Sequence, residues 1–193
     1  LSDKTCVVAV TLGTGIGGGI IMKGQLFRGA HYAAGEIGHM RSNLNNHRLC
    51  TCGLFDCWES YGSGRGFRAT AKEMLTNVTV DQTPLAALLP DPPVDKVCAA
   101  AKEGDIIAKR IVDTWHEHVC AGIVTLAHTL DPDCFIISGG MSKFVDYDFL
   151  KELVIDKCLP RVGERLDIHR SSLGDDAGII GAAQIALDNL VSS

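Results

Sequence analysis

Four side chains that bind soft metals lie close together in the first third of the chain. His39, in the string GEIGHM, is followed by Cys50, Cys52 and Cys57 in the string CTCGLFDC. One imidazole and three thiolates form the ligand set of a closed, tetrahedral structural zinc site. Zinc is favoured over an iron–sulfur cluster, because a cluster usually takes four thiolates and no fourth cysteine lies nearby in the sequence. The spacing therefore predicts a structural zinc ion on these four residues.

The same residues have a plainer interpretation. The cysteines could be small core residues or form a transient disulfide, although a Cys-x-Cys pair is geometrically poor for a local disulfide. His39 alone could be an ordinary core or surface histidine. If one of its ring nitrogens binds zinc, the other is free to donate a hydrogen bond outward. The other five of the eight cysteines are scattered among apolar residues. We therefore expect reduced thiols and a cytoplasmic protein.

Two glycine-rich segments each follow an apolar, strand-like run. GTGIGGG begins at Gly13, and Ser138-Gly139-Gly140 closes the second run. Glycine lets backbone N–H groups approach phosphate oxygens closely. The first segment matches neither the P-loop nor the dinucleotide fingerprint, and a structural turn explains it equally well. Two such segments at strand ends, where open α/β sheets bind ligands, favour a nucleotide site.

The elements that must position these residues alternate between strands and helices. We expect strands at 5–12, 20–22, 25–28, 134–137 and 166–169, helices at 57–75, 105–130, 147–159 and 177–190, and an irregular connection at 77–93. The segment GTGIGGG is expected to form a tight loop, and Lys23-Gly24 a two-residue hairpin turn. Asp105 is the expected N-cap of the longest helix. The order indicates an α/β fold with a mixed sheet and flanking helices.

Length and charge exclude several classes of protein. A chain of 193 residues can bury a substantial core as one large domain. Its net charge of -5 offers no basic stripe for nucleic acid or for a membrane surface. Gly, Lys or Asp interrupts every apolar run before it reaches the length of a membrane span. Small-molecule partners are the expectation that remains.

The motifs resemble, in the same order, those of the ROK family of sugar kinases and sugar-responsive repressors. The similar segments are VTLGTGIGGGI (10–20), AGEIGHM (34–40), CTCGLFDCWES (50–60), IISGGM (136–141) and AGIIGAA (177–183). The resemblance implies a ribonuclease H-like lobe of the actin/hexokinase type with an inserted zinc-binding loop. Asp56 departs from the family, which usually has a glycine there, so we expect a different turn before Cys57.

The resemblance also implies roles for individual residues. The residues implied to bind sugar hydroxyls are Glu36, His39 and Glu59, and those implied to bind zinc are His39, Cys50, Cys52 and Cys57. The residues implied to approach the ATP phosphates are Gly13, Thr14 and Gly15, with Gly139 and Gly140 on the adenosine side. Carboxylates and an oriented imidazole are good partners for vicinal hydroxyls, which agrees with the first set.

The implied activity is ATP-dependent phosphorylation of a hexose or an amino sugar, with Mg²⁺ and structural zinc, by a homodimer. The family's phosphate motif and catalytic Asn-Asp motif precede the first strand of this sequence. Residues 1–193 are therefore expected to be a C-terminal lobe without its N-terminal lobe, silent in catalysis on its own. We name no catalytic residue, since Asp175 and Asp176 are better explained as a solvated helix cap.

Two other functions remain open. The same lobe could sense sugar in a transcriptional repressor whose helix-turn-helix, in a missing N-terminal segment, would bind DNA. A zinc-stabilised module without a ligand is a third reading, which the two glycine-rich segments disfavour. The sugar itself is not specified, because the glucose, fructose, N-acetylmannosamine and N-acetylglucosamine kinases of this type share these motifs.

Overall fold

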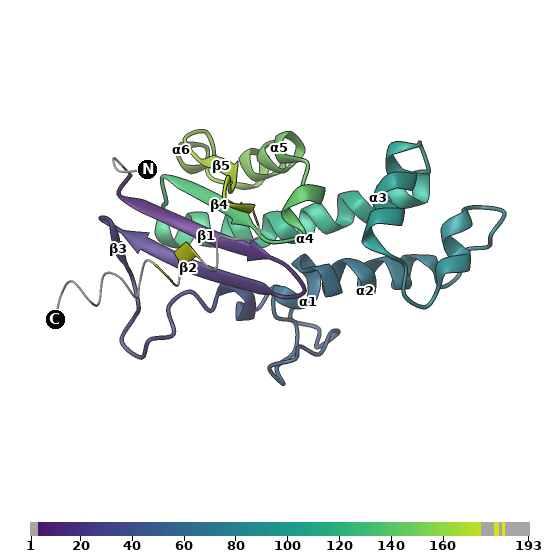
Figure 1. The fold of residues 1–193 in the computed structure, drawn as a ribbon, viewed down its shortest axis with the longest axis horizontal. Coiled ribbons are helices and arrows are strands. Elements are labelled where there is room, and N and C mark those ends of the chain that lie inside the picture. Colours follow the sequence, from purple (N-terminus) through teal and green to yellow (C-terminus); the bar gives the residue numbers. More distant parts are fainter. Residues whose placement is uncertain (1–3, 175–179, 182, 184–193) are drawn as a thin grey trace.

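Five strands form one mixed sheet in the order β3-β2-β1-β4-β5 (Figure 1). The computed structural model describes residues 4–174, 180–181 and 183. The strands are β1 (Cys6–Leu12), β2 (Ile16–Met22), β3 (Gln25–Leu26), β4 (Cys134–Ser138) and β5 (Asp167–Arg170). β1 pairs antiparallel with β2 and parallel with β4, which in turn pairs parallel with β5. The expected α/β fold with a mixed sheet is confirmed.

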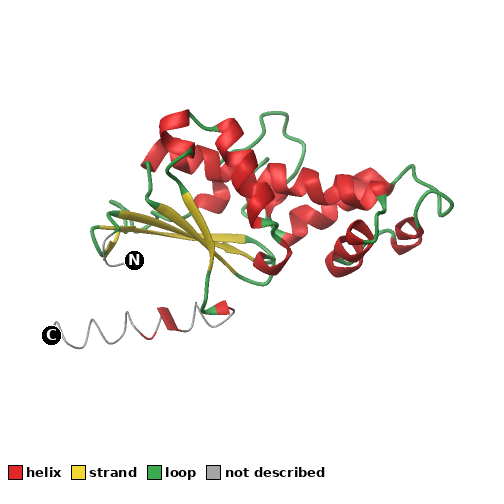
Figure 2. Cartoon of the chain, turned by 90° about the horizontal axis from the view of Figure 1, so that it is seen from above, coloured by secondary structure: helices red, strands yellow, loops and turns green. Residues whose placement is uncertain are grey.

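Helices cover one side of this sheet, and Figure 2 shows the long ones as a layer beside the strands. The α-helices are α1 (Glu59–Gly62), α2 (Gly64–Leu75), α3 (Val94–Lys102), α4 (Ile106–Leu130), α5 (Tyr147–Lys157) and α6 (Pro160–Gly163). Short 3-10 helices are η1 (Ile37–His39), η2 (Pro84–Leu88) and η3 (Ser142–Phe144). None of the helices in the described part of the chain combines the length and apolar character that a membrane span requires.

The core lies between the sheet and α4. Neighbouring side chains of β1 and β4, such as Val8 beside Phe135 and Val10 beside Ile137, are fully buried. The apolar stripe of α4 packs on the same core, and its fully buried members are Ile111, Trp115, Val119 and Ile123. α4 begins where it was predicted to begin, because the Asp105 side chain accepts a hydrogen bond from the Ala108 amide at 2.8 Å.

Two indole hydrogen bonds fasten α1 to α4. Trp58 Nε1 donates to the His118 carbonyl at 2.7 Å, and Trp115 Nε1 donates to the Gly62 carbonyl at 2.9 Å. Both rings are buried, so each N–H needs such a partner. The short helix that carries Glu59 is thereby fixed to α4, the longest of the described helices.

The prediction of a loop over the whole glycine-rich segment is wrong. Only Gly13 to Gly15 form the turn, and Gly17 to Gly19 belong to β2, where they pair with β1. A side chain at Gly18 would overlap Ile37 and approach the Gly35 carbonyl oxygen to 2.9 Å. The glycines therefore let η1 lie directly against the strand, which a pattern read along the sequence does not reveal.

The helix predicted from Cys57 to about Leu75 is two helices. Ser63 adopts an extended conformation between α1 and α2, and its Oγ accepts a hydrogen bond from the Gly66 amide at 3.1 Å. The predicted hairpin is present, with Lys23 and Gly24 both at positive φ, although its second strand ends at Leu26. η2 interrupts the connection predicted to be irregular, and α3 was not predicted. The final helix predicted at 177–190 lies almost wholly outside the described residues.

Candidate functional site

The four predicted metal ligands meet beside η1 and α1. One ligand atom from each of His39, Cys50, Cys52 and Cys57 can be chosen so that all four lie within 4.8 Å of one another. The Cys50 Sγ is 3.9 Å from His39 Nδ1, and the sulfurs of Cys52 and Cys57 are 3.6 Å apart. A tetrahedral zinc ion with Zn–S bonds of about 2.3 Å holds its ligands about 3.8 Å apart. The donor set and spacing fit zinc.

The thiols of this cluster have unusual acidities. Burial raises the pKa of Cys50, but hydrogen bonds from the Cys52 amide and from neighbouring side chains outweigh it and lower that pKa to about 7. Burial and the neighbouring Cys52 and Cys50 thiols raise the pKa of Cys57 to about 12. One thiol therefore ionises near neutral pH, whereas a second negative charge is opposed until a cation is bound.

Asp56 organises the loop between Cys52 and Cys57. Its φ of 59° is the left-handed conformation that glycine, the residue implied here by the family resemblance, takes easily. The buried carboxylate accepts hydrogen bonds from the His47 amide at 3.0 Å, the Arg48 amide at 2.9 Å and the Tyr61 hydroxyl at 2.6 Å. Burial opposes ionisation of this carboxyl, but these donors hold its pKa below the usual range.

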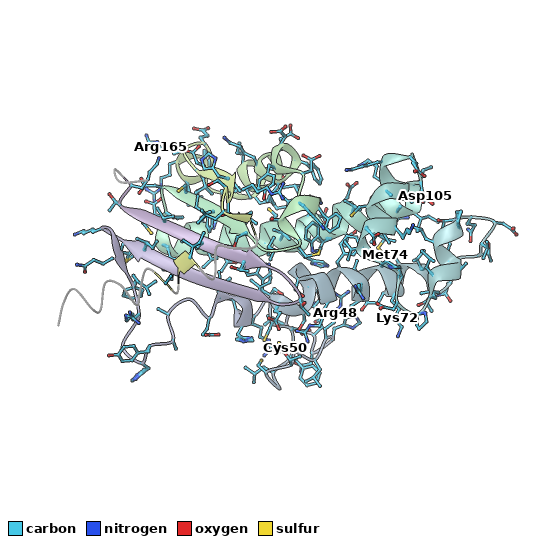
Figure 3. The ribbon with its side chains drawn as sticks, in the orientation of Figure 1. Arg48, Cys50, Lys72, Met74, Asp105 and Arg165 are labelled. Atoms are coloured by element: carbon cyan, nitrogen blue, oxygen red, sulfur yellow. The ribbon has the colours of Figure 1, made fainter. Side chains whose placement is uncertain are left out.

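Arg48, which lies two residues before Cys50, joins the cysteine-bearing segment to α1 and α2. Its side chain donates to the Ser60 carbonyl at 3.1 Å and to Thr70 Oγ1 at 3.0 Å, and the guanidinium stacks 4.5 Å from the centre of the Tyr61 ring. Figure 3 shows Arg48 and Cys50 on the loop next to the start of α2. The cysteine loop is therefore fastened to the helices through protein contacts as well as through its predicted metal.

Glu59 lies beside the cluster and is almost buried. Its Oε2 accepts a hydrogen bond from the Ile16 amide at 2.9 Å, and its Oε1 accepts from Arg65 Nη2 at 2.6 Å and from Thr51 Oγ1 at 3.3 Å. A side chain at Gly15 would overlap Oε2, so this glycine makes room for the carboxylate. The structure thus puts Gly15 next to Glu59.

Glu36 and His39 lie at the surface of the same region. The Glu36 side chain is 71% exposed, and its Oε2 is 3.8 Å from His39 Nε2. The other ring nitrogen, Nδ1, faces the Cys50 sulfur. The imidazole therefore presents one nitrogen to the predicted metal and the other toward a carboxylate at the surface, which is the arrangement that a shared metal and ligand role requires.

A cavity of about 530 Å³ lies at the ends of β1 and β4. Its lining residues are Gly13, Thr14, Gly64, Arg65, Arg68, Val94, Gly140 and Met141. Three of the five residues predicted to bind nucleotide, Gly13, Thr14 and Gly140, line it. Gly139 does not line it but supports it, since its φ of 83° lets the chain turn against the Leu12 carbonyl oxygen.

The two arginines in this cavity were missed by the sequence analysis. Arg65 and Arg68 lie in the first two turns of α2, where the helix dipole also favours anions. The signal that could have identified them is the Ser63 break, because it turns the start of α2 toward the glycine turn, where Gly64 N donates to the Gly13 carbonyl at 2.8 Å. Arg68 also pairs with Asp91 at 2.8 Å. The cavity is suited to a polyanionic ligand.

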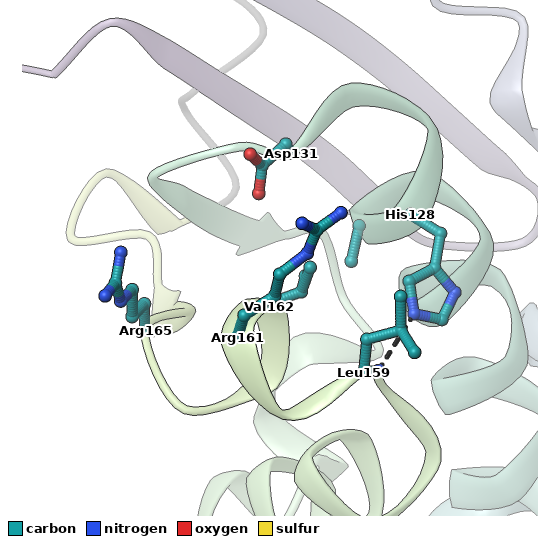
Figure 4. Close-up of a pocket in the computed structure, with 7 residues that line it drawn as sticks. His128, Asp131, Leu159, Arg161, Val162 and Arg165 are labelled. Atoms are coloured by element: carbon teal, nitrogen blue, oxygen red, sulfur yellow. Dashed lines mark hydrogen bonds between the residues drawn. The ribbon is translucent and has the colours of Figure 1, made fainter.

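A second cavity, of about 380 Å³, lies at the C-terminal end of α4 (Figure 4). Its walls include His128, Asp131, Arg161 and Arg165, and His128 Nε2 accepts a hydrogen bond from the Leu159 amide at 3.1 Å. None of the residues predicted from the sequence to bind metal, sugar or nucleotide lines it. We therefore assign the site to the first cavity and to the cluster next to it.

Comparison with known proteins gives the family. A sequence model of the ROK family matches residues 2–189, and the chain belongs to that family. It is 35% identical to the glucokinase of Streptomyces coelicolor, over 93% of this chain and 59% of that protein. It is 33% identical to the N-acetyl-D-glucosamine kinase of Vibrio atlanticus, over 95% of this chain and 59% of that protein. The chain thus spans only part of the length of these relatives.

A solved structure supports the same assignment. The crystal structure of a ROK family glucokinase from Streptomyces griseus in complex with glucose and AMPPNP superposes with a TM-score of 0.74 at 32% identity. The match covers 95% of this chain and 61% of that one. The mixed sheet with its flanking helices is therefore the fold of a ROK sugar kinase.

Proposed function

We propose that the chain forms the C-terminal lobe of an ATP-dependent kinase that phosphorylates a hexose or an amino sugar. The observation that carries the proposal is the arginine-lined cavity at the glycine turn. Its Arg65 donates a hydrogen bond to Glu59, which is almost buried beside the His39–cysteine cluster. A polyanion site and a carboxylate for hydroxyl groups are thereby adjacent. The names of the relatives, glucokinase and N-acetyl-D-glucosamine kinase, support the reaction class.

In this proposal each ligand has its own protein groups. The backbone of Gly13 and Thr14 and the guanidinium groups of Arg65 and Arg68 bind the phosphates of ATP, with Gly139 and Gly140 toward the adenosine. Mg²⁺, bound with the nucleotide, neutralises charge on the phosphoryl group during transfer. The residues that accept or donate hydrogen bonds to the sugar hydroxyls are Glu36, His39 and Glu59.

Zinc has a structural role in this proposal. Four protein ligands leave no open coordination position for water, so the ion takes no part in the chemistry. His39 follows Glu36 in the chain and Cys57 precedes Glu59, so the ion ties together the two segments that carry the sugar carboxylates. This arrangement agrees with the ribonuclease H-like lobe with an inserted zinc loop that the family resemblance implies.

The same family resemblance suggests the oligomeric state and a further lobe. We propose that the chain functions as part of a homodimer in which a further lobe supplies the group that takes the hydroxyl proton. None of the eight cysteines, all of which the structure describes, is paired in a disulfide, and both unpaired thiols and a thiolate zinc site suit a reducing, cytoplasmic compartment.

Calorimetric titration of the zinc-loaded chain with glucose, N-acetylglucosamine and AMPPNP with Mg²⁺ tests the proposal. We expect one of the sugars and AMPPNP to bind at one site each. A chain that binds sugar but no nucleotide would instead match a sugar-sensing regulator. A chain that binds neither ligand while holding zinc would contradict both functions and leave a zinc-stabilised module.

A further inference from the structure

We propose that Arg65 is a positioning residue that makes the sugar and the nucleotide bind cooperatively. The inference rests on the proposed function and adds to it a physical link between the two ligands. Its basis is that one guanidinium group is shared between the nucleotide cavity and the Glu59 carboxylate. No separate allosteric element is needed for such a link, because both sites contact the same side chain.

The contacts of Arg65 put it between the two sites. Its Nη2 donates to Glu59 Oε1 at 2.6 Å and to Thr51 Oγ1 at 3.4 Å, and its Nε donates to the Thr14 carbonyl at 3.3 Å. The side chain also lines the cavity of about 530 Å³ and is 40% exposed, against 12% for that of Glu59. None of the hydrogen bonds within the described part of the chain uses Nη1, so that group can bind a phosphate oxygen.

The break at Ser63 makes this contact possible. In one continuous helix, residues six apart point in directions about 120° apart and do not meet, because only positions three and four apart are neighbours. Ser63 is extended and caps α2, which lets Arg65 fold back onto the helix that precedes it. The pair is therefore a product of this particular turn.

The Glu59 carboxylate has little capacity left for a sugar hydroxyl. Oε2 accepts from the Ile16 amide and is covered by Gly15, while Oε1 already accepts from Arg65 and Thr51. A carboxylate oxygen has about two lone-pair directions. A hydroxyl that donates to Oε1 must therefore displace Arg65 at least in part.

Cooperativity follows from this competition. A phosphate that binds Nη1 draws the guanidinium into the cavity and weakens its hydrogen bond to Glu59, and a sugar hydroxyl displaces the same group from the other side. The ligand that binds first bears the cost of opening the pair, and the second does not. Linkage requires the effect to be reciprocal, so each ligand strengthens the binding of the other by the same factor. We expect a factor of about five, at the low end for coupled sites, because the pair is partly exposed.

Calorimetry on the zinc-loaded chain measures this factor directly. Glucose, or N-acetylglucosamine if it binds more tightly, is titrated without and with saturating AMPPNP and Mg²⁺. In the wild type we expect AMPPNP to lower the sugar Kd about fivefold. In Arg65→Gln the two sugar Kd values should agree. Arg65→Lys keeps the charge but loses the forked donors, so an intermediate ratio is expected.

Arg68→Gln is the matched control, because Arg68 lines the same cavity but pairs with Asp91 rather than with Glu59. It should weaken AMPPNP and still keep the wild-type ratio. Should Arg65→Gln fail to fold, the ratio in Arg65→Lys decides. A ratio in the Arg65 variants equal to that of the wild type overturns the proposal. If the wild-type chain binds both ligands independently, the cooperativity proposal is overturned and the proposed function stands. If the chain binds no AMPPNP, both the cooperativity proposal and the proposed function are overturned.

Discussion

Glu59 is held by the first backbone amide of β2, and this depends on the glycine that precedes it. The Ile16 amide donates a hydrogen bond to its Oε2 at 2.9 Å. A Cβ at position 15 would overlap that oxygen, so only glycine fits there. The sequence singled out both residues but assigned them to different ligands. Their contact was not predictable, because it depends on how the turn folds over α1 and not on any spacing along the chain.

Replacing Gly15 with alanine should move Glu59 off the Ile16 amide. We expect a loss of about 1–3 kcal/mol in the free energy of unfolding, from overpacking and an unsatisfied buried group, together with weaker sugar binding. Gly13→Ala is the control in the same turn, since no atom lies within 4 Å of a Cβ built there. Chemical denaturation measures both variants. Equal stability of the two would show that the close approach of Gly15 to Glu59 has no energetic weight.

The break between α1 and α2 decides which residues face the site. The apolar pattern from Cys57 onward predicted one helix, and the Ser63 cap divides it because the Ser63 Oγ satisfies the Gly66 amide. α3 was not predicted, because its sequence alone gives the helix little stability. It has nine residues with only three of them buried, so its stability comes from packing on α4 rather than from its own sequence.

Removal of the Ser63 cap by Ser63→Ala should cost about 1 kcal/mol and also strengthen sugar binding in the absence of nucleotide, because Arg65 is no longer held against Glu59 and the sugar need not displace it. Asp146→Ala removes the cap of α5, where Asp146 Oδ1 accepts from the Phe149 amide at 3.1 Å, away from the site. It should cost a similar amount and leave sugar affinity unchanged. Thermal denaturation and calorimetry give the two readouts. The same change of sugar affinity in both variants, or no change in Ser63→Ala, would argue against a local effect of the Ser63 break.

α4 carries a histidine that should make stability depend on pH. Burial and the charge of Arg48 lower the pKa of His118 from 6.5 to about 4. The unfolded chain therefore takes up a proton between these values and the folded chain does not, so stability falls as the pH drops from about 6.5 toward 4. We expect about 1–2 kcal/mol less stability at pH 5 than at pH 7 from this residue.

His118→Phe keeps the ring that packs 5.1 Å from Tyr61 but removes the titration. Its free energy of unfolding between pH 7 and pH 5 should change by correspondingly less than that of the wild type. Urea denaturation at several pH values makes the comparison. Parallel pH profiles for the two proteins would mean that His118 has the same pKa in the folded and the unfolded chain.

At the scale of the whole molecule, the sequence predicted the order of the main elements and the α/β class. That His39, Cys50, Cys52 and Cys57 come together in space was also predictable, since four side chains that bind soft metals lie within a short stretch of chain. The two arginines of the cavity were not, because they become neighbours of the glycine turn only after α2 changes direction. Motifs identified the ligand-binding segments, and the packing of α1 and α2 determined how those segments meet.

The 193-residue chain by itself should bind its ligands without phosphorylating sugar. The reason is that, in the proposed function, a further lobe supplies the group that takes the hydroxyl proton. A coupled assay for ADP formation with glucose and N-acetylglucosamine checks this. Sugar-dependent turnover by this chain would contradict the assignment of the missing group to a further lobe.

The central claim is that zinc on His39, Cys50, Cys52 and Cys57 shapes the sugar site. The most direct measurement is sugar affinity by calorimetry on zinc-loaded chain and on Cys52→Ser, with zinc content determined on the same samples. We predict one zinc per wild-type chain, none in the variant, and sugar binding weaker by about tenfold or more in the variant. Sugar affinity that stays at the wild-type value after proven loss of zinc would contradict the claim.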